Sequence, residues 1–169
     1  MRDALEHWRT RLQGLQTLQL PTDRPHPPEA PSAGRTLALR LGAELTAAVK
    51  AFARQHDATL FMALLSAFQA LLMRYTGQDD VAVGVPVAGR ENPRMREGVG
   101  FFVNMLVLRV DLGGTPSCAE LVRRSRKATL EALAHQDMPF DRLVSELGPA
   151  RGASRNPLYQ GAFALENFG

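Results

Sequence analysis

The polar side chains that could do chemistry in this sequence lie in three unusual stretches, at residues 99–105, 134–141 and 154–160. At the first stretch, Gly98 and Gly100 precede a pair of phenylalanines and Asn104, which stands on the approach to an apolar run. A buried amide without hydrogen-bond partners lowers the stability of the fold by about 1–3 kcal/mol. We therefore expect the side chain of Asn104 to be hydrogen-bonded. It either ties down a bend of the main chain or lines a binding tunnel.

The second stretch reads Ala-His-Gln-Asp-Met-Pro-Phe-Asp and combines a polar stop with a proline. Aspartate is a common N-cap residue, and proline is well tolerated in the first turn of a helix. The pattern therefore predicts a junction between two helices, with Asp137 capping the second. A role in a site for His135, Gln136, Asp137 and Pro139 is the functional alternative.

In the third stretch, Arg155 could pair with a carboxylate elsewhere in the fold, and Asn156 precedes a proline, which favours an extended main chain. A structural clamp is the first interpretation and a site role the second. No common nucleophile, phosphate or dinucleotide motif occurs in the sequence. The histidines lack partners at metal-ligand spacing, so no metal site is expected; they are His7, His26, His56 and His135.

Composition narrows the class of protein. The 169 residues carry 20 Lys and Arg against 17 Asp and Glu, a net charge of +3, without a basic stripe interleaved with aromatics. Nucleic acid is therefore not an expected partner. The densest basic cluster spans residues 123–127 on one predicted helix, as a solvated face or as a docking patch for an acidic protein.

Compartment follows from what the sequence lacks. Cys118 is the only cysteine, so no disulfide can form within the chain, and we expect a half-buried packing residue in a reducing, cytoplasmic setting. The first residues lack the apolar core of a signal peptide. The apolar run 60–73 is shorter than the roughly 20 residues of a membrane span and predicts a helix buried on all sides.

The elements that must position these residues follow from hydrophobic periodicity. Helices are predicted over 2–13, 43–56, 59–75 and 117–135 and from Pro139 onward, and strands over 35–41, 81–87, 105–110 and 158–165. A proline-rich connector covers 14–34. Strands separated by helix pairs predict an α/β fold, a mixed sheet flanked by helices.

Taken together, the three stretches resemble the motifs of condensation domains in non-ribosomal peptide synthetases. In that family, Ile-Gly-x-Phe-Val-Asn-Thr is followed by His-Gln-Asp-x-Pro-Phe and then by Arg-x-x-Ser-Arg-Asn-Pro-Leu. Here these motifs appear in the same order at residues 99–105, 135–140 and 151–158, with Met105 in place of the usual threonine. Flanking stretches agree as well, so the resemblance covers nearly the whole chain; they are residues 8–12, 20–25, 58–62, 74–80 and 83–90.

The resemblance implies a fold of two lobes, each like chloramphenicol acetyltransferase, with a tunnel between them. Carrier proteins bring their 4′-phosphopantetheine arms to the tunnel, where an amine attacks a thioester and an amide forms. The family's His-His-x-x-x-Asp-Gly motif, in the N-terminal lobe, is absent here. The implied assignment is the C-terminal half of a condensation domain: an initial helix over 1–13, the connector over 14–34 and an α/β lobe over 35–169, inactive alone.

The resemblance also implies the partners and the site. The expected partners are the N-terminal lobe, peptidyl carrier proteins and the adenylation domain of the same assembly line, with no membrane and no directly bound cofactor. No residue of this chain is assigned a catalytic role, and His135 is not the base. The resemblance places four residues near the tunnel: Arg90, Asn104, Arg155 and Asn156. Arg90 is expected to form an ion pair with the aspartate of the missing motif.

Two other hypotheses stay open. The chain could be a non-catalytic module that binds carrier proteins as a scaffold. It could also be a separate small acyltransferase that uses coenzyme A, which would require a histidine base.

Overall fold

The computed structural model describes residues 2–23, 34–89, 98, 100, 102–148 and 156–166. Its elements follow in chain order as α1 (Arg2–Leu12), α2 (Ala43–Gln55), α3 (Leu60–Thr76), β1 (Asp80–Val87), β2 (Asn104–Asp111), α5 (Cys118–Ala134) and α6 (Phe140–Leu147). Each of these helices and strands lies where periodicity predicted one, to within one or two residues.

The valine-rich strands β1 and β2 form an antiparallel pair in which Val81 lies opposite Val110 and Val85 opposite Leu106. A third segment joins the other edge of β1 through an isolated parallel bridge between Gly84 and Ala162. The Gly84 N–H donates to the carbonyl of Gly161 at 2.9 Å, and the Phe163 N–H donates to the carbonyl of Gly84 at 2.9 Å. The α/β class with a mixed sheet is therefore confirmed.

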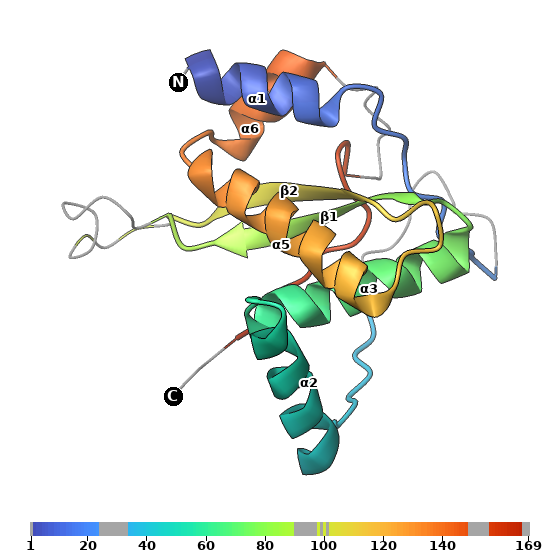
Figure 1. The fold of residues 1–169 in the computed structure, drawn as a ribbon. Coiled ribbons are helices and arrows are strands. Elements are labelled where there is room, and N and C mark those ends of the chain that lie inside the picture. The colour runs from blue at the N-terminus through green and yellow to red at the C-terminus, as the bar shows by residue number, and fades with distance from the viewer. Residues whose placement is uncertain are drawn as a thin grey trace.

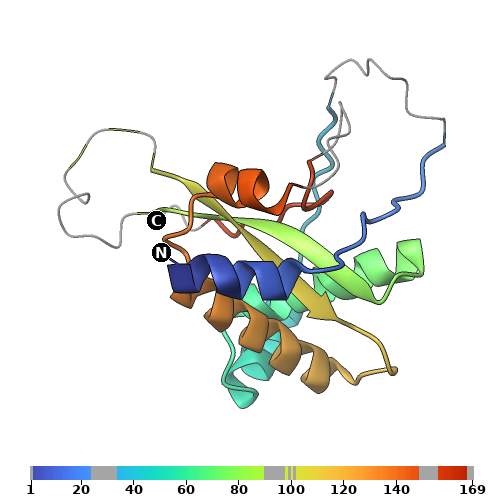
Figure 2. The same ribbon diagram turned by 90° about the horizontal axis from the view of Figure 1, so that it is seen from above.

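Helices cover both faces of this sheet (Figure 1). α1 and α6 contact each other on one side of the strands, and α3 packs against β1 on the other. α5 contacts both β2 and α3, whereas α2 contacts α3 and projects away from the body. Seen from above, α1 and α6 lie side by side over the strands (Figure 2). The core between the layers includes Trp8, Leu65, Val83 and Leu108, each at most 1% exposed.

Local capping residues set the ends of α3 and α5. The Thr59 hydroxyl accepts from the Met62 N–H at 3.2 Å at the start of α3, and the Ser117 hydroxyl accepts from the Glu120 N–H at 3.2 Å at the start of α5. Gly77 ends α3 with φ 69°, a left-handed conformation that favours glycine. These caps satisfy main-chain groups that a helix end leaves without partners.

Two predicted strands are wrong as regular elements. Residues 34–42 are extended and exposed but belong to no sheet, and residues 158–165 contribute only the bridge at Ala162. Alternating hydrophobicity indicates that a segment can form a strand, but a strand in a sheet also needs a neighbouring strand as its hydrogen-bond partner. No such neighbour lies beside residues 34–42 in the described parts of the chain.

Two burial predictions are also wrong. α3 is not buried on all sides, since Leu71 is 50% exposed. Cys118 is exposed instead of half-buried. The periodic pattern gives the direction of a face, whereas the extent of its cover depends on which elements lie against it.

No single helix within the described ranges is long and apolar enough to cross a membrane, although the pair α2 and α3, bent by 103°, passes by length and composition alone.

Candidate functional site

The side-chain amide of Asn104, the first residue of β2, ties the strand to the turn between α5 and α6. Its Nδ2 donates to the carbonyls of Gln136 at 2.9 Å and Met138 at 2.8 Å. Its Oδ1 accepts from the main-chain N–H of Phe140 at 3.0 Å. Both amide hydrogens and the oxygen therefore have partners, and the first two of the three sequence stretches meet at one point.

The start of α6 needs a hydrogen-bond partner from outside the turn, because its own N-cap residue supplies none. α5 stops at Ala134, and α6 begins at Phe140 after Pro139, which makes no side-chain cap. The prediction that Asp137 caps α6 is wrong, because Asp137 is exposed and Asn104 holds the Phe140 N–H instead. A residue 36 positions away in the sequence thus satisfies the helix end.

The ring of His135 lies on the α1 side of the same turn. Its Nδ1 is 2.9 Å from the carbonyl of Glu131, and the ring stacks on His7 with centroids 3.8 Å apart and planes 2° apart. Trp8 Nε1 donates to the main-chain carbonyl of His135 at 3.2 Å. Within the described ranges, His7 Nε2 is a buried nitrogen without a hydrogen-bond partner.

Desolvation lowers the pKa of His7 below its ordinary value of 6.5, and the neighbouring His135 lowers it further, against the opposing effect of Glu131. Both effects favour the neutral form of the His7 imidazole. Because the two rings stack against each other and His135 Nδ1 is engaged, this arrangement attaches α1 to the turn.

The third sequence stretch forms a local turn. The Oδ1 of Asn156 accepts from the N–H groups of Leu158 at 3.0 Å and Tyr159 at 3.3 Å, an Asx turn. Gln160 Nε2 donates to the Asn156 carbonyl at 3.0 Å, and Gln160 Oε1 accepts from the Leu18 N–H at 2.7 Å. Asn156 thus shapes the segment that follows it. Arg90 and Arg155 lie outside the described residues.

Glycine at position 84 allows this segment to reach the sheet. A Cβ on Gly84 would lie 2.5 Å from Cε2 of the Tyr159 ring, closer than non-bonded carbons approach. The same residue exchanges hydrogen bonds with Gly161 and Phe163. Sequence reasoning did not single out Gly84, although a glycine inside a valine-rich strand is itself a sign of close approach.

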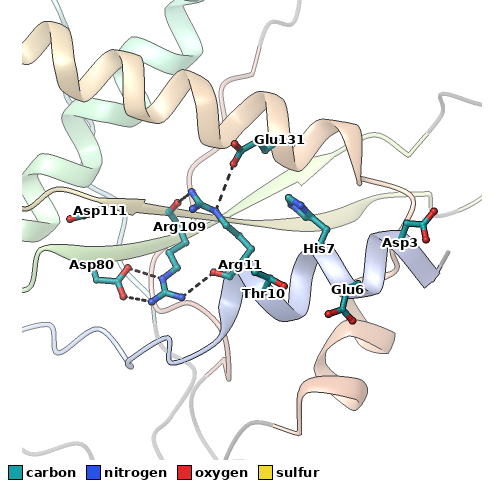
Figure 3. Close-up of a pocket in the computed structure, with 9 residues that line it drawn as sticks. All are labelled: Asp3, Glu6, His7, Thr10, Arg11, Asp80, Arg109, Asp111 and Glu131. Carbon is teal, nitrogen blue, oxygen red and sulfur yellow. Dashed lines mark hydrogen bonds and ion pairs between the residues drawn. The ribbon is translucent and has the colours of Figure 1, made fainter.

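A polar cavity of about 950 Å³ lies between α1, the strands and α5 (Figure 3). Arg109 crosses it, with Nε and Nη2 donating to the two carboxylate oxygens of Asp80 at 2.8 and 2.7 Å. Arg109 Nη1 also donates to the carbonyls of Arg11 at 3.0 Å and Gln13 at 2.7 Å. The hydrogen bond to Asp80 raises the pKa of Arg109 above its ordinary range.

The remaining charges of this cavity are mostly acidic. Arg11 Nη2 donates to the Arg109 carbonyl at 2.6 Å, and its Nε lies 4.0 Å from a Glu131 oxygen. Figure 3 shows Asp3 and Glu6 on α1 at the opposite end from Asp111. Because both arginines are engaged with main-chain and carboxylate oxygens, they fix α1 to the sheet edge. The charged side chains that line the cavity link α1 to the strands. Among the side chains that the structure describes, the cavity contains no paired nucleophile and base.

A second, apolar cavity of about 420 Å³ lies between the start of α3, the end of β1, β2 and the end of α5. Phe61, Val85, Leu106 and Leu133 line it, together with residues 164–166. Nearby, Gln69 is fully buried in the core and its Oε1 accepts from the Ser125 hydroxyl at 2.6 Å. Gln69 was visible in the sequence as one of two polar interruptions of an apolar run.

Part of the positive charge of the basic cluster of α5 is paired with carboxylates on the same helix. Arg123 and Arg124 both donate to the Glu120 carboxylate, at 2.6–2.8 Å, and this lowers the pKa of Glu120 to about 2. Arg126 donates to the Asp57 carbonyl at 2.8 Å. These pairs favour the solvated helix face over the docking patch. In the described parts of the chain, no group of three His, Cys, Asp or Glu side chains could hold a metal ion.

Comparisons with known proteins agree with this geometry. A family model described as "Condensation domain" matches residues 1–169. A linear gramicidin synthase of Brevibacillus parabrevis is 48% identical over 166 residues, which are 98% of this chain and 3% of that protein. Malpinin synthetase of Mortierella alpina is 44% identical over 168 residues, 99% of this chain and 2% of that protein.

Solved structures give the same picture. A four-domain nonribosomal peptide synthetase bound to AMP and glycine superposes with a TM-score of 0.91 at 26% identity, over 99% of this chain and 13% of that one. The X-domain from teicoplanin biosynthesis superposes with a TM-score of 0.90 at 30% identity, over 95% of this chain and 36% of that one. The chain thus spans a small part of the length of the proteins it matches.

Proposed function

Because this chain belongs to the condensation-domain family, we propose that it is the C-terminal half of a domain that joins carrier-bound aminoacyl or peptidyl thioesters in nonribosomal peptide synthesis. In this reaction the amine of one carrier-bound substrate attacks the thioester carbonyl of the other. A C–N bond forms, the C–S bond breaks, the amine loses a proton and the departing thiolate gains one. The 4′-phosphopantetheine arms belong to the carrier proteins and enter as part of the substrates.

The match of the family model over residues 1–169 is the observation that carries the proposal. The Asn104 contacts support it, because they join two family-like motifs that are far apart in the sequence. Such contacts hold this chain's side of the tunnel, which we term the tunnel wall, in a fixed position. A fixed wall can position the two reactants, and such positioning can supply a large part of a rate acceleration. We place Asn104 and Asn156, with Arg90 and Arg155, along that wall.

The proton-handling histidine belongs, in this proposal, to the N-terminal lobe. Within this chain, His7 and His135 are stacked on each other, and the ring of His56 packs edge-on against Phe52 with centroids 4.6 Å apart. None of these three is paired with a nucleophilic side chain of the described residues. The chain is therefore a wall of the reaction chamber that is inactive alone, with the N-terminal lobe, carrier proteins and an adenylation domain as its partners.

The test is a reconstitution of amide formation. The purified chain is incubated with two carrier proteins bearing aminoacyl thioesters, alone and together with a co-expressed N-terminal lobe from the gramicidin synthase relative, and dipeptidyl carrier is measured by mass spectrometry. We expect product only when both halves are present. Product from the chain alone would refute the proposal, as would a reconstituted pair without product.

A mixture that binds a loaded carrier but never forms product would instead favour the scaffold function. His135→Ala serves as the matched control in the reconstituted pair. A loss of more than about a hundredfold in rate, with carrier binding unchanged, would indicate that His135 is the base and would contradict its assignment to the N-terminal lobe.

A further inference from the structure

Residues 34–42, which we term the leucine strap, run extended into the start of α2 and are exposed throughout. Leu37 is 82% exposed, Leu39 81% and Leu41 56%. Residues two apart in an extended chain share a face, so the three leucines form one apolar row. A contiguous row of this kind on a protein surface marks a contact site more often than chance exposure.

The main chain of the leucine strap is also without partners. Among the described residues, no hydrogen bond reaches the N–H or C=O groups of residues 35–41, and the first bonded group is the Gly42 carbonyl, which accepts from the Thr46 N–H at 3.0 Å. An extended segment with one apolar face and free main-chain groups has the properties of an unpaired sheet strand. The absent partner must therefore supply both apolar contact and main-chain hydrogen bonds.

The larger proteins that superpose on this chain contain polypeptide beyond the matched part. The superposition on the four-domain synthetase covers 99% of this chain with a TM-score of 0.91, while the chain is only 13% of that protein. The X-domain likewise has nearly two thirds of its length outside the match, which covers 36% of it. In both, further polypeptide is available to cover a strap that lies bare here.

We propose that the leucine strap is the seam with the rest of the condensation domain, and that it binds an extended strand whose alternate residues are apolar. This inference rests on the proposed function. A strand fits better than a helix because only a strand satisfies a row of unpaired main-chain groups. The opposite face of the strap carries Thr36, Ala38 and Arg40, which suits a partner strand that is polar on its outer side.

The experiment measures assembly instead of catalysis. The tagged chain is co-expressed with the remainder of the condensation domain from the linear gramicidin synthase relative, and the affinity of the two parts is measured after purification. The strap variant is the double substitution L37S/L39S. The matched control is L71S/L130S, which removes two leucines that are 50% and 45% exposed on α3 and α5.

We expect the strap variant to bind the remainder at least roughly tenfold more weakly, because two apolar side chains lose their buried contact, and the control to bind within about twofold of the unchanged chain. Hydrogen exchange adds a readout specific to strand pairing. The amides of residues 37–41 should become protected on assembly in the unchanged chain, which apolar contact alone would not achieve.

Equal binding by the strap variant, or assembly without new amide protection in the strap, overturns the inference. So does a stable dimer of this chain, joined through the strap, that the remainder does not displace. Failure of the unchanged chain to bind the remainder overturns the proposed function and the inference together. Assembly and amide formation that are indifferent to the strap substitutions overturn the inference alone.

Discussion

Replacement of Asn104 by alanine should destabilise the chain more than its exposure suggests. The substitution removes three hydrogen bonds at once, and leaves the carbonyls of Gln136 and Met138 and the N–H of Phe140 without a partner. Each unsatisfied buried group costs about 1–3 kcal/mol. Because Asn104, Gln136 and Phe140 are only partly buried while Met138 is 2% exposed, water can replace some of these bonds, and we expect a loss of about 2–4 kcal/mol.

Urea unfolding measures this loss directly, and for a chain of this length it corresponds to a fall in Tm of roughly 4–16 °C. Hydrogen exchange at the Phe140 amide should accelerate, because its acceptor is gone. Asn104→Asp separates the two halves of the contact, since it keeps an acceptor for Phe140 and removes both donors. We expect Asp to preserve protection at Phe140 while it still lowers the free energy of unfolding.

Asn156→Ala is the matched control. It removes an asparagine that accepts two main-chain N–H bonds within its own turn, so faster exchange should appear at Leu158 and not at Phe140. An Asn104→Ala chain that loses less than about 0.5 kcal/mol, or that keeps full protection at Phe140, would refute the idea that this side chain holds the turn.

Three further predictions concern the contacts that position the same elements. Gly84→Ala should lose about 1–3 kcal/mol by overpacking, measured by thermal unfolding, and Tyr159→Ala in the same chain should recover part of the loss; strictly additive losses would contradict the steric explanation. The lowered pKa of His7 means that the unfolded chain binds the proton more readily, so stability should fall as pH drops below about 6.5; His7→Gln should flatten this dependence in urea titrations between pH 5 and 8, and an unchanged slope would exclude His7 as its source. Arg109→Lys should lose about 1–3 kcal/mol because lysine cannot make the two-pronged contact, whereas Arg123→Lys, on an exposed pair, should change stability by less than about 0.5 kcal/mol.

The Asp137 prediction shows where local reasoning failed. Aspartate two residues before proline is a reasonable cap by statistics, and the junction itself lies where the pattern placed it. The main-chain N–H of Phe140 has its partner in Asn104 instead, because the fold brings the start of β2 against the turn. Capping preferences describe a helix with its own neighbours and carry no information about a strand that arrives from elsewhere.

The sequence by itself determined the α/β class, the bounds of most helices and strands, and the family, because these depend on periodicity, capping residues and ordered motifs. Only the tertiary structure decided which polar groups meet: Asn104 with the α5–α6 turn, Arg109 with Asp80 and two α1-side carbonyls, and Gly84 with Tyr159. These contacts join residues that are far apart in the sequence, and the local sequence pattern around each residue does not show which distant residue it will contact. The same reason explains the leucine strap, whose alternation is that of a strand while its hydrogen-bond partner is missing from the described chain.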